Sequence, residues 1–195
     1  MFSNCISLNI INIGYYFYSS NFLNMSYMFY NCSSLTSIDL SILEHTSDIY
    51  DISYIFAYCT QLKQLYFPLI DYTDLKSMSN AFRNCTSLVS IEIDFYLTAE
   101  DMSYLFFGCI SLTYIYFWNF IYPEHLKYMN YMFYDCHSLK SINNLLDFNK
   151  DISTTKLNTT NLLDISYMFS GCSSLISIDF SNFMMKNVIN YKGIF

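Results

Sequence analysis

MSYMFYNCSSLTSIDL, residues 25–40, is the stretch that decides the fold, because nearly the same phrase returns along the whole chain. It comes back as MSYLFFGCISLTYIYF at residues 102–117 and as ISYMFSGCSSLISIDF at residues 165–180. One phenylalanine marks the same position in every copy: Phe2, Phe29, Phe56, Phe82, Phe106, Phe133, Phe169 and Phe195. Successive members are 24–27 residues apart, except for one step of 36 residues. Such a period indicates stacked repeats, since one unit alone cannot bury its apolar side.

The first half of each unit has the spacing of a short helix. Met25, Met28 and Phe29 lie at positions i, i+3 and i+4, which share one helical face. The residue before this run is suited to cap a helix N-terminus in four of the copies: Asn24, Asp51, Asp101 and Asp164. Residues that tolerate a left-handed backbone follow the run and would close the helix: Asn31, Asn84, Gly108, Asp135 and Gly171. Tyr58 breaks this pattern.

The second half of each unit has the spacing of a β-strand. Leu35, Ile38 and Leu40 follow the L-x-x-L-x-L signature of leucine-rich repeats, whose last part alternates inward and outward. The fold class predicted from both halves is an α/β repeat solenoid. This right-handed leucine-rich-repeat-like stack would carry a parallel β-sheet on one side and short helices or 3₁₀ turns on the other.

The period also predicts the domain organisation. Residues 1–195 would form a single domain of about seven units, with a polar insertion near residues 144–163 in the long step. Both ends fall in mid-repeat, since residues 191–195 align with residues 25–29. Repeat arrays normally carry polar caps. We therefore expect either a fragment of a longer array or end-to-end self-association through uncapped repeats.

Two of the phrases carry a family resemblance: NMSYMFYNCSSLTSIDLS at residues 24–41 and DISYMFSGCSSLISIDFSNF at residues 164–183. They resemble the BspA-like leucine-rich repeat surface proteins of bacteria and several protists, and the similarity covers essentially the whole chain. The resemblance implies adhesion, binding of host or matrix proteins, and a cell-surface or secreted location. It implies no shared catalytic residues. Neither a signal peptide nor an anchor is visible in the sequence.

The composition excludes several classes of protein. Apolar residues make up 53% of the chain and charged residues 13%, which is the opposite of a disordered composition. No apolar run is long enough for a membrane span. The net charge of −7 provides no basic surface for nucleic acid. A protein partner of unknown identity is the remaining prediction.

All seven cysteines occupy one repeat position: Cys5, Cys32, Cys59, Cys85, Cys109, Cys136 and Cys172. A column of buried, reduced thiols is predicted. A disulfide framework is the alternative, although an odd number and side chains pointing in one direction argue against it. No paired C-x-x-C motif indicates zinc. His45, His125 and His137 are scattered, and only His137 follows a cysteine of the column, so we predict no enzyme, no metal and no cofactor.

Outward-facing residues of the predicted strands form the candidate binding surface. Aromatic side chains gather on one strand beside acidic ones on its neighbour, and tyrosine and tryptophan dominate interface hot spots. The predicted partner-binding residues are Tyr66, Glu92, Asp94, Tyr114, Tyr116 and Trp118. Since tyrosine has AT-rich codons and the chain holds 20 tyrosines, a merely solvated face is the alternative. The insertion, with a glycosylation sequon at Asn158, is a second candidate, and a tolerated loop is its alternative.

The sequence thus predicts a non-enzymatic protein-interaction solenoid, of the surface or adhesion type by resemblance. An intracellular scaffold or recognition module, or a truncated fragment of a longer array, is the alternative.

Overall fold

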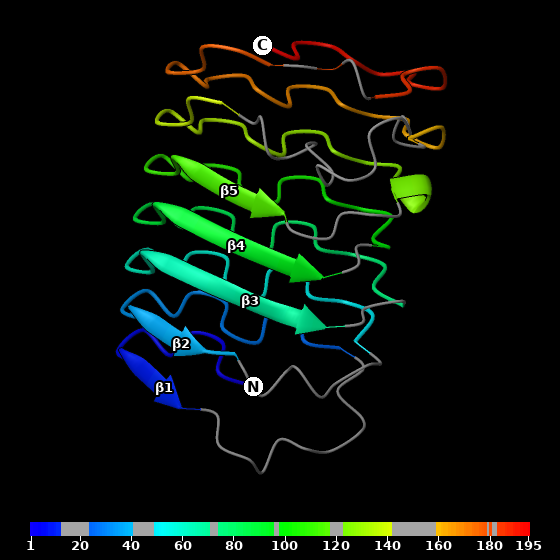
Figure 1. Cartoon of the computed structure of the whole chain (residues 1–195). Helices are drawn as coiled ribbons and strands as arrows, with labels where there is room; N and C mark the ends of the chain where they lie inside the picture. The colour runs from blue at the N-terminus through cyan, green and yellow to red at the C-terminus, as the bar shows by residue number, and fades with distance from the viewer. Residues whose placement is uncertain are drawn as a thin grey trace.

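The chain forms a stack of coils in which every repeat lies on the one before it (Figure 1). The computed structural model describes residues 1–12, 24–40, 49–70, 74–95, 98–117, 123–141, 159–178, 180 and 183–195. Its strands lie along one side of the stack: β1 (Ile10–Asn12), β2 (Ser37–Asp39), β3 (Gln64–Ile70), β4 (Ser90–Phe95) and β5 (Tyr114–Phe117).

The strands pair in parallel, as the repeat pattern predicted. β1 pairs with β2, and β3, β4 and β5 form a second sheet in which Leu65, Ile91 and Ile115 lie in one row. Each of these five strands comes from a different repeat, because the L-x-x-L-x-L phrase recurs at the same place in each coil, and the next two repeats meet there in an isolated parallel bridge between Ser141 and Ser177. β2 and β3 belong to different sheets, so the predicted continuous sheet is interrupted between them.

Of the predicted short helices or 3₁₀ turns, the repeat helices are wrong within the part of the chain that is described, and tight turns closed between residues i and i+3 occupy their place. The only helix there is the short 3₁₀ helix η3 (Pro123–His125). In the phrase at residues 25–40, the Met28 amide donates to the Met25 carbonyl at 3.2 Å, whereas the Phe29 amide donates to the Ile55 carbonyl of the next coil at 2.9 Å. Amides therefore alternate between a tight turn in their own coil and the neighbouring coil. A helix would keep them all within one coil.

A left-handed residue in the middle of the phrase is the physical reason for this difference. Tyr27 has a φ of 58°, and Tyr54, Tyr104, Tyr131 and Tyr167 have the same sign of φ at the same position. A helix cannot pass through such a residue, because every helical residue needs a negative φ. The spacing i, i+3, i+4 thus arises from two successive turns that both direct apolar side chains inward.

The predicted cap residues accept amide hydrogen bonds, but they cap turns instead of helices. Asp51 Oδ1 accepts from the Ser53 amide at 2.8 Å, and Asp101 and Asp164 make the same contact. These residues also lie in a second ladder of parallel bridges between coils. Short polar side chains of this kind bond their own backbone two residues on, which starts a turn.

The predicted left-handed closing residues are confirmed. A positive φ occurs at all of them: Asn31, Asn84, Gly108, Asp135 and Gly171. Tyr58 adopts a φ of 65° as well, so the expectation that it breaks the pattern is wrong. The neighbouring coils impose the conformation, since the Tyr58 amide donates to the Arg83 carbonyl at 2.7 Å.

A column of stacked phenylalanine rings runs through the core. Phe29 and Phe56 have ring centres 5.2 Å apart and planes 4° apart, and Phe106 stacks on Phe82 and Phe133 in the same way. Phe29, Phe56, Phe82, Phe106 and Phe133 are fully buried. Identical residues stack because the coils are in register, so each ring fills the space above the ring before it.

A column of cysteines lies beside the phenylalanines. Cys59 Sγ donates to the Phe29 carbonyl at 3.2 Å, and each later cysteine donates to the phenylalanine carbonyl of the preceding coil in the same manner. All seven cysteines are free, and those from Cys32 to Cys136 are buried. Burial raises the pKa of Cys59 to about 12. The predicted buried thiols are confirmed for five of the seven positions, whereas Cys5 is exposed and Cys172 is partly exposed.

The stacking predicts that a central ring contributes more stability than a terminal one. Phe106→Ala should lower the free energy of unfolding by about 3–5 kcal/mol, because neighbouring rings on both sides prevent the cavity from closing. Phe2→Ala is the matched control, since Phe2 is only partly buried and stacks on Phe29 alone within the described stack. Urea unfolding of both variants measures the difference. Equal losses would contradict the stacked core.

The thiol column predicts a sharp pattern of chemical labelling. A thiol reagent at neutral pH should modify Cys5 at once and partly exposed Cys172 slowly, because thiolate and access are both needed for reaction. The five buried cysteines should react only when denaturant unfolds the chain. Peptide mass spectrometry identifies the labelled positions. Rapid labelling of Cys85 or Cys109 in the folded chain would contradict the buried column.

Candidate functional site

The outward face of β3, β4 and β5 brings together residues that the sequence predicted as a binding surface. Tyr66 on β3 is 51% exposed and Tyr114 on β5 is 60% exposed, whereas Leu65 and Ile91 on the other face are buried. Glu92 on β4 is also exposed. The alternation of the strand, with a period of two residues, turns all three side chains to the same side.

The strand register places these residues in two neighbouring rows. Tyr66, Glu92 and Tyr116 are partners across β3, β4 and β5, and Gln64, Ser90 and Tyr114 form the adjacent row. In parallel strands such partners are separated by about 4.8 Å. The carboxylate of Glu92 therefore lies on a strand between two strands that carry tyrosine. The side chains of Tyr116 and Asp94, and the whole of Trp118, lie outside the described residues.

A groove of about 410 Å³ opens on this face where the two sheets meet. Ile38 of β2 lines one side, Tyr66 and Gln64 of β3 line the middle, and Ser90 and Glu92 of β4 line the other side. It lies where β2 and β3 are not paired. Sequence reasoning missed this groove, because the repeat phrase is the same on both sides of the interruption.

Glu92 differs from Glu100 in its electrostatic surroundings. Glu100 lies between two lysines of neighbouring coils, with Lys127 Nζ at 2.6 Å and Lys76 Nζ at 3.9 Å, and these contacts lower the pKa of its carboxyl group. Glu92 forms no ion pair among the residues that the structure describes.

Cys136 and His137, the one cysteine–histidine pair adjacent in sequence, are not arranged as a nucleophile and its base. Cys136 Sγ donates into the core to the Phe106 carbonyl at 3.1 Å, and burial raises the pKa of Cys136 well above its ordinary value. His137 is exposed on the surface, 3.7 Å from Asp135. The two side chains, although adjacent in sequence, therefore point apart. His45 lies outside the described residues.

The described residues contain no group of three or more histidine, cysteine, aspartate or glutamate side chains that could hold a metal ion. Nor does any helix among them have the length and apolar character to cross a membrane.

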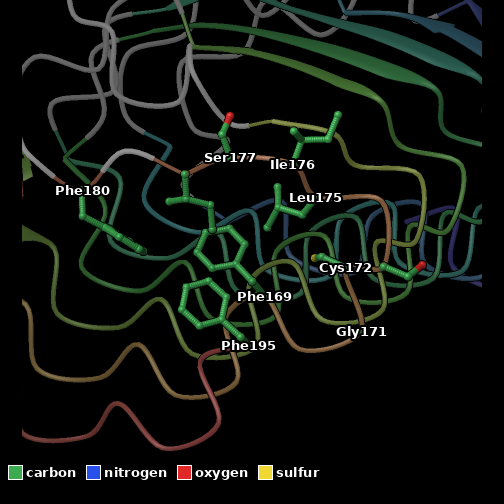
Figure 2. Close-up of a pocket in the computed structure, with 10 residues that line it drawn as sticks. Phe169, Gly171, Cys172, Leu175, Ile176, Ser177, Phe180 and Phe195 are labelled. Atoms are coloured by element: carbon green, nitrogen blue, oxygen red, sulfur yellow. The ribbon is translucent and has the colours of Figure 1, made fainter.

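A second cavity, of about 430 Å³, lies beside the coil that contains Phe169 (Figure 2). Leu175 and Phe180 line it, with Phe169 and Phe195 at its base and Cys172 to the side. These are repeat positions that the following coil covers elsewhere in the stack. The cavity is therefore a continuation of the apolar core. Its lining is suited to packing against another apolar surface, and it lacks a set of polar groups arranged around a small ligand.

The predicted insertion is described only at its end. Thr159 is fully buried, and its hydroxyl donates to the Met184 carbonyl at 3.2 Å and accepts from the Met184 amide at 2.7 Å. This part is thus attached to the following coil. The sequon asparagine, Asn158, lies outside the described residues.

Comparison with known families agrees with this architecture. Residues 1–93 match the BspA type leucine rich repeat region in six copies. Residues 76–195 match the family described as Mycoplasma protein of unknown function, DUF285. No curated protein matches the chain.

Solved structures with similar folds are bacterial leucine-rich repeat proteins. The T. pallidum leucine-rich repeat protein TpLRR is 18% identical with a TM-score of 0.50, over 87% of this chain and 68% of that one. A leucine-rich repeat protein from Bacteroides ovatus ATCC 8483 is 20% identical with a TM-score of 0.48, over 99% of this chain and 48% of that one. The chain thus spans about half the length of the second protein. The match over residues 76–195 shows that the chain belongs to the family described as Mycoplasma protein of unknown function, DUF285, and the match over residues 1–93 relates it to the BspA type leucine rich repeat proteins.

Proposed function

We propose that the chain is a non-enzymatic protein-interaction solenoid and that it binds its partner on the outward face of β3, β4 and β5. The observation that carries this proposal is the row in which the exposed Glu92, which forms no ion pair within the described part of the chain, lies on a strand between Tyr66 and Tyr116. Repeat proteins use extended sheet surfaces of this kind for binding. As a domain, residues 1–195 form one solenoid of about seven units in this proposal.

The exposed tyrosines supply the contact area. A tyrosine side chain has few rotatable bonds, so it gives a large apolar surface and a hydroxyl group at a low cost in conformational entropy. Tyr66 and Tyr114 are each more than half exposed, yet they stand on a hydrogen-bonded sheet. A rigid support of this type keeps the binding groups in position before the partner arrives.

The acidic residues supply the selectivity. Glu92 lines the groove between the two sheets, and Asp94 follows it on the same strand. A lysine or arginine of the partner that entered this groove would meet a carboxylate and the ring of Tyr66 together. Both groups attract a cation, the first by its charge and the second by its π-electrons. The predicted partner is therefore a protein segment with basic side chains.

The proposal also includes the cellular location of this interaction. BspA-like leucine-rich repeat proteins are associated with cell surfaces and adhesion, which supports a surface role for this chain. An intracellular recognition module with the same sheet face is the alternative, and the partner's compartment separates the two. End-to-end association of copies, expected from the sequence, stays a prediction.

Mutation of the proposed face should weaken binding without unfolding the chain. A displayed library of random peptides, selected on the wild-type chain, should yield peptides rich in lysine and arginine. Tyr66→Ala, Tyr114→Ala and Trp118→Ala should each weaken the selected peptides by about 2 kcal/mol, a roughly thirtyfold rise in Kd. Glu92→Gln should act in the same direction and reduce the salt dependence of binding.

Two variants on other parts of the molecule serve as controls. Ser177→Ala changes an exposed residue at an isolated β-bridge of a distant coil, and Glu124→Gln removes one negative charge from η3. Neither should alter the affinity. If the selected peptides bound all of these variants with wild-type affinity, the sheet face would be ordinary surface, and the insertion around Asn158 would become the next candidate.

A further inference from the structure

The turns of the stack carry a second ordered set of tyrosines, away from the proposed binding face. Tyr27, Tyr54, Tyr104, Tyr131 and Tyr167 occupy the third position of the repeat phrase, each with a φ between 54° and 58°. Asparagine and glycine adopt this conformation with less strain, and Asn80 and Gly193 fill the position in two other coils. Tyrosine is thus used against the preference of the backbone, which points to a contribution from the ring itself.

These tyrosines form two columns of parallel rings. The ring centres of Tyr104 and Tyr131 are 4.7 Å apart with planes 4° apart, and those of Tyr131 and Tyr167 are 4.8 Å and 19° apart. Tyr27 and Tyr54 form the other column at 4.6 Å and 7°. Because the rings are parallel at this distance, the ortho carbons of one phenol lie close to those of the next.

The columns are accessible from solvent, in contrast to the parallel phenylalanine column of the core. Tyr27 is 46% exposed, and the other members are partly exposed. Burial is the main cause that raises the pKa of Tyr27 and of Tyr131, so both phenols stay protonated at neutral pH. Solvent can therefore reach phenol groups that already lie in pairs, whereas the buried thiols of the same coils are shielded from reagents.

We propose that these two columns are sites of oxidative cross-linking, in which neighbouring tyrosines of successive coils join as dityrosine. The co-reactant is a peroxide, used by a haem-type peroxidase. The products would be Tyr104–Tyr131 or Tyr131–Tyr167 in one column and Tyr27–Tyr54 in the other. Each link would tie two coils covalently, without any disulfide.

Each of the two phenols loses one electron and its O–H proton and becomes a phenoxyl radical. The two radicals form one bond between their ortho carbons, and the two ortho hydrogens then move as protons to the two oxygens, which restores both aromatic phenols. The net change is the loss of two hydrogen atoms, which reduce one hydrogen peroxide to two water molecules.

Stacking selects which tyrosines react with one another. Radical coupling needs a second phenol within contact distance during the short life of the radical. Tyr66 and Tyr191 are more exposed than Tyr27, the most exposed member of the columns, but no tyrosine ring of the described residues stacks on either of them. If exposure alone decided the products, the most exposed tyrosines would dominate the links. If stacking decides them, the links join the tyrosines of the two columns.

The test treats the full chain, at low concentration, with hydrogen peroxide and a haem peroxidase. Cleavage after acidic residues separates all three pairs, and mass spectrometry then identifies linked peptides that lack two hydrogen atoms. We expect intramolecular links at Tyr27–Tyr54, Tyr104–Tyr131 and Tyr131–Tyr167, together with dityrosine fluorescence. Omission of peroxide should leave all tyrosines unlinked.

A pair of hydroxyl-deletion variants makes the test specific. Tyr131→Phe keeps a ring in the column but removes the phenol, so it should abolish both links of that column and leave Tyr27–Tyr54 unchanged. Tyr128→Phe is the matched control, since it removes an exposed phenol that stacks on no tyrosine ring among the described residues. Both variants should keep the wild-type unfolding midpoint within error.

Two results would overturn the proposal. One is a product mixture dominated by Tyr66, Tyr191 or links between separate chains, which would mean that exposure and collision decide the chemistry. The other is a Tyr131→Phe variant with the same yield of linked peptides as the wild type. Neither result depends on the peptide-binding face, so this proposal and the proposed function fail independently.

Discussion

Hydrogen bonds from alternate amides of each turn to the next coil are the interaction on which the rest of the structure depends. The amides of Tyr54, Phe56 and Tyr58 donate to carbonyls of the following coil at 3.0, 2.9 and 2.7 Å. The amides between them close tight turns within their own coil. All these backbone groups are thereby satisfied on the side of the stack that has no sheet, as a buried backbone requires. This alternation depends on the left-handed residues, because their backbone conformation turns alternate amides toward the next coil.

The exact register of these bonds produces the columns of identical side chains. Phe56 lies directly over Phe29, and Cys59 donates to the carbonyl of Phe29. Buried apolar rings and thiols pack in register in the interior, since each coil repeats the shape of its neighbour. On the surface the same register orders functional groups: the row of Tyr66 and Glu92 on the sheet, and the stacked phenols of Tyr104 and Tyr131 on the turns. The candidate surfaces are therefore consequences of the stacking, built on a rigid support.

Much of this architecture could be predicted from the period of the phrase. The parallel strands, the buried cysteines and the left-handed residues such as Asn31 and Gly108 followed from residue type and spacing. The helix could not be excluded from the sequence, because Met25, Met28 and Phe29 have the same spacing in a helix and in two linked turns. The positive φ of Tyr27 distinguishes the two turns from a helix, but a tyrosine in a sequence does not indicate a positive φ as a glycine does. The interruption between β2 and β3, which opens the groove beside Tyr66, has no visible signal in the repeat phrase.

Native-state hydrogen exchange of the turn amides tests the central claim most directly. If the turns are held by the next coil, the amides of Tyr54, Phe56 and Tyr58 should exchange only with the cooperative opening of the stack. Their exchange free energies should then equal those of the β4 amides, and Phe82→Ala, in the coil that accepts their bonds, should lower all of them together. Dependence on the next coil would be contradicted if these amides exchanged by local fluctuation while the β4 amides stayed protected. Their exchange free energies would then be low, and Phe82→Ala would leave them unchanged.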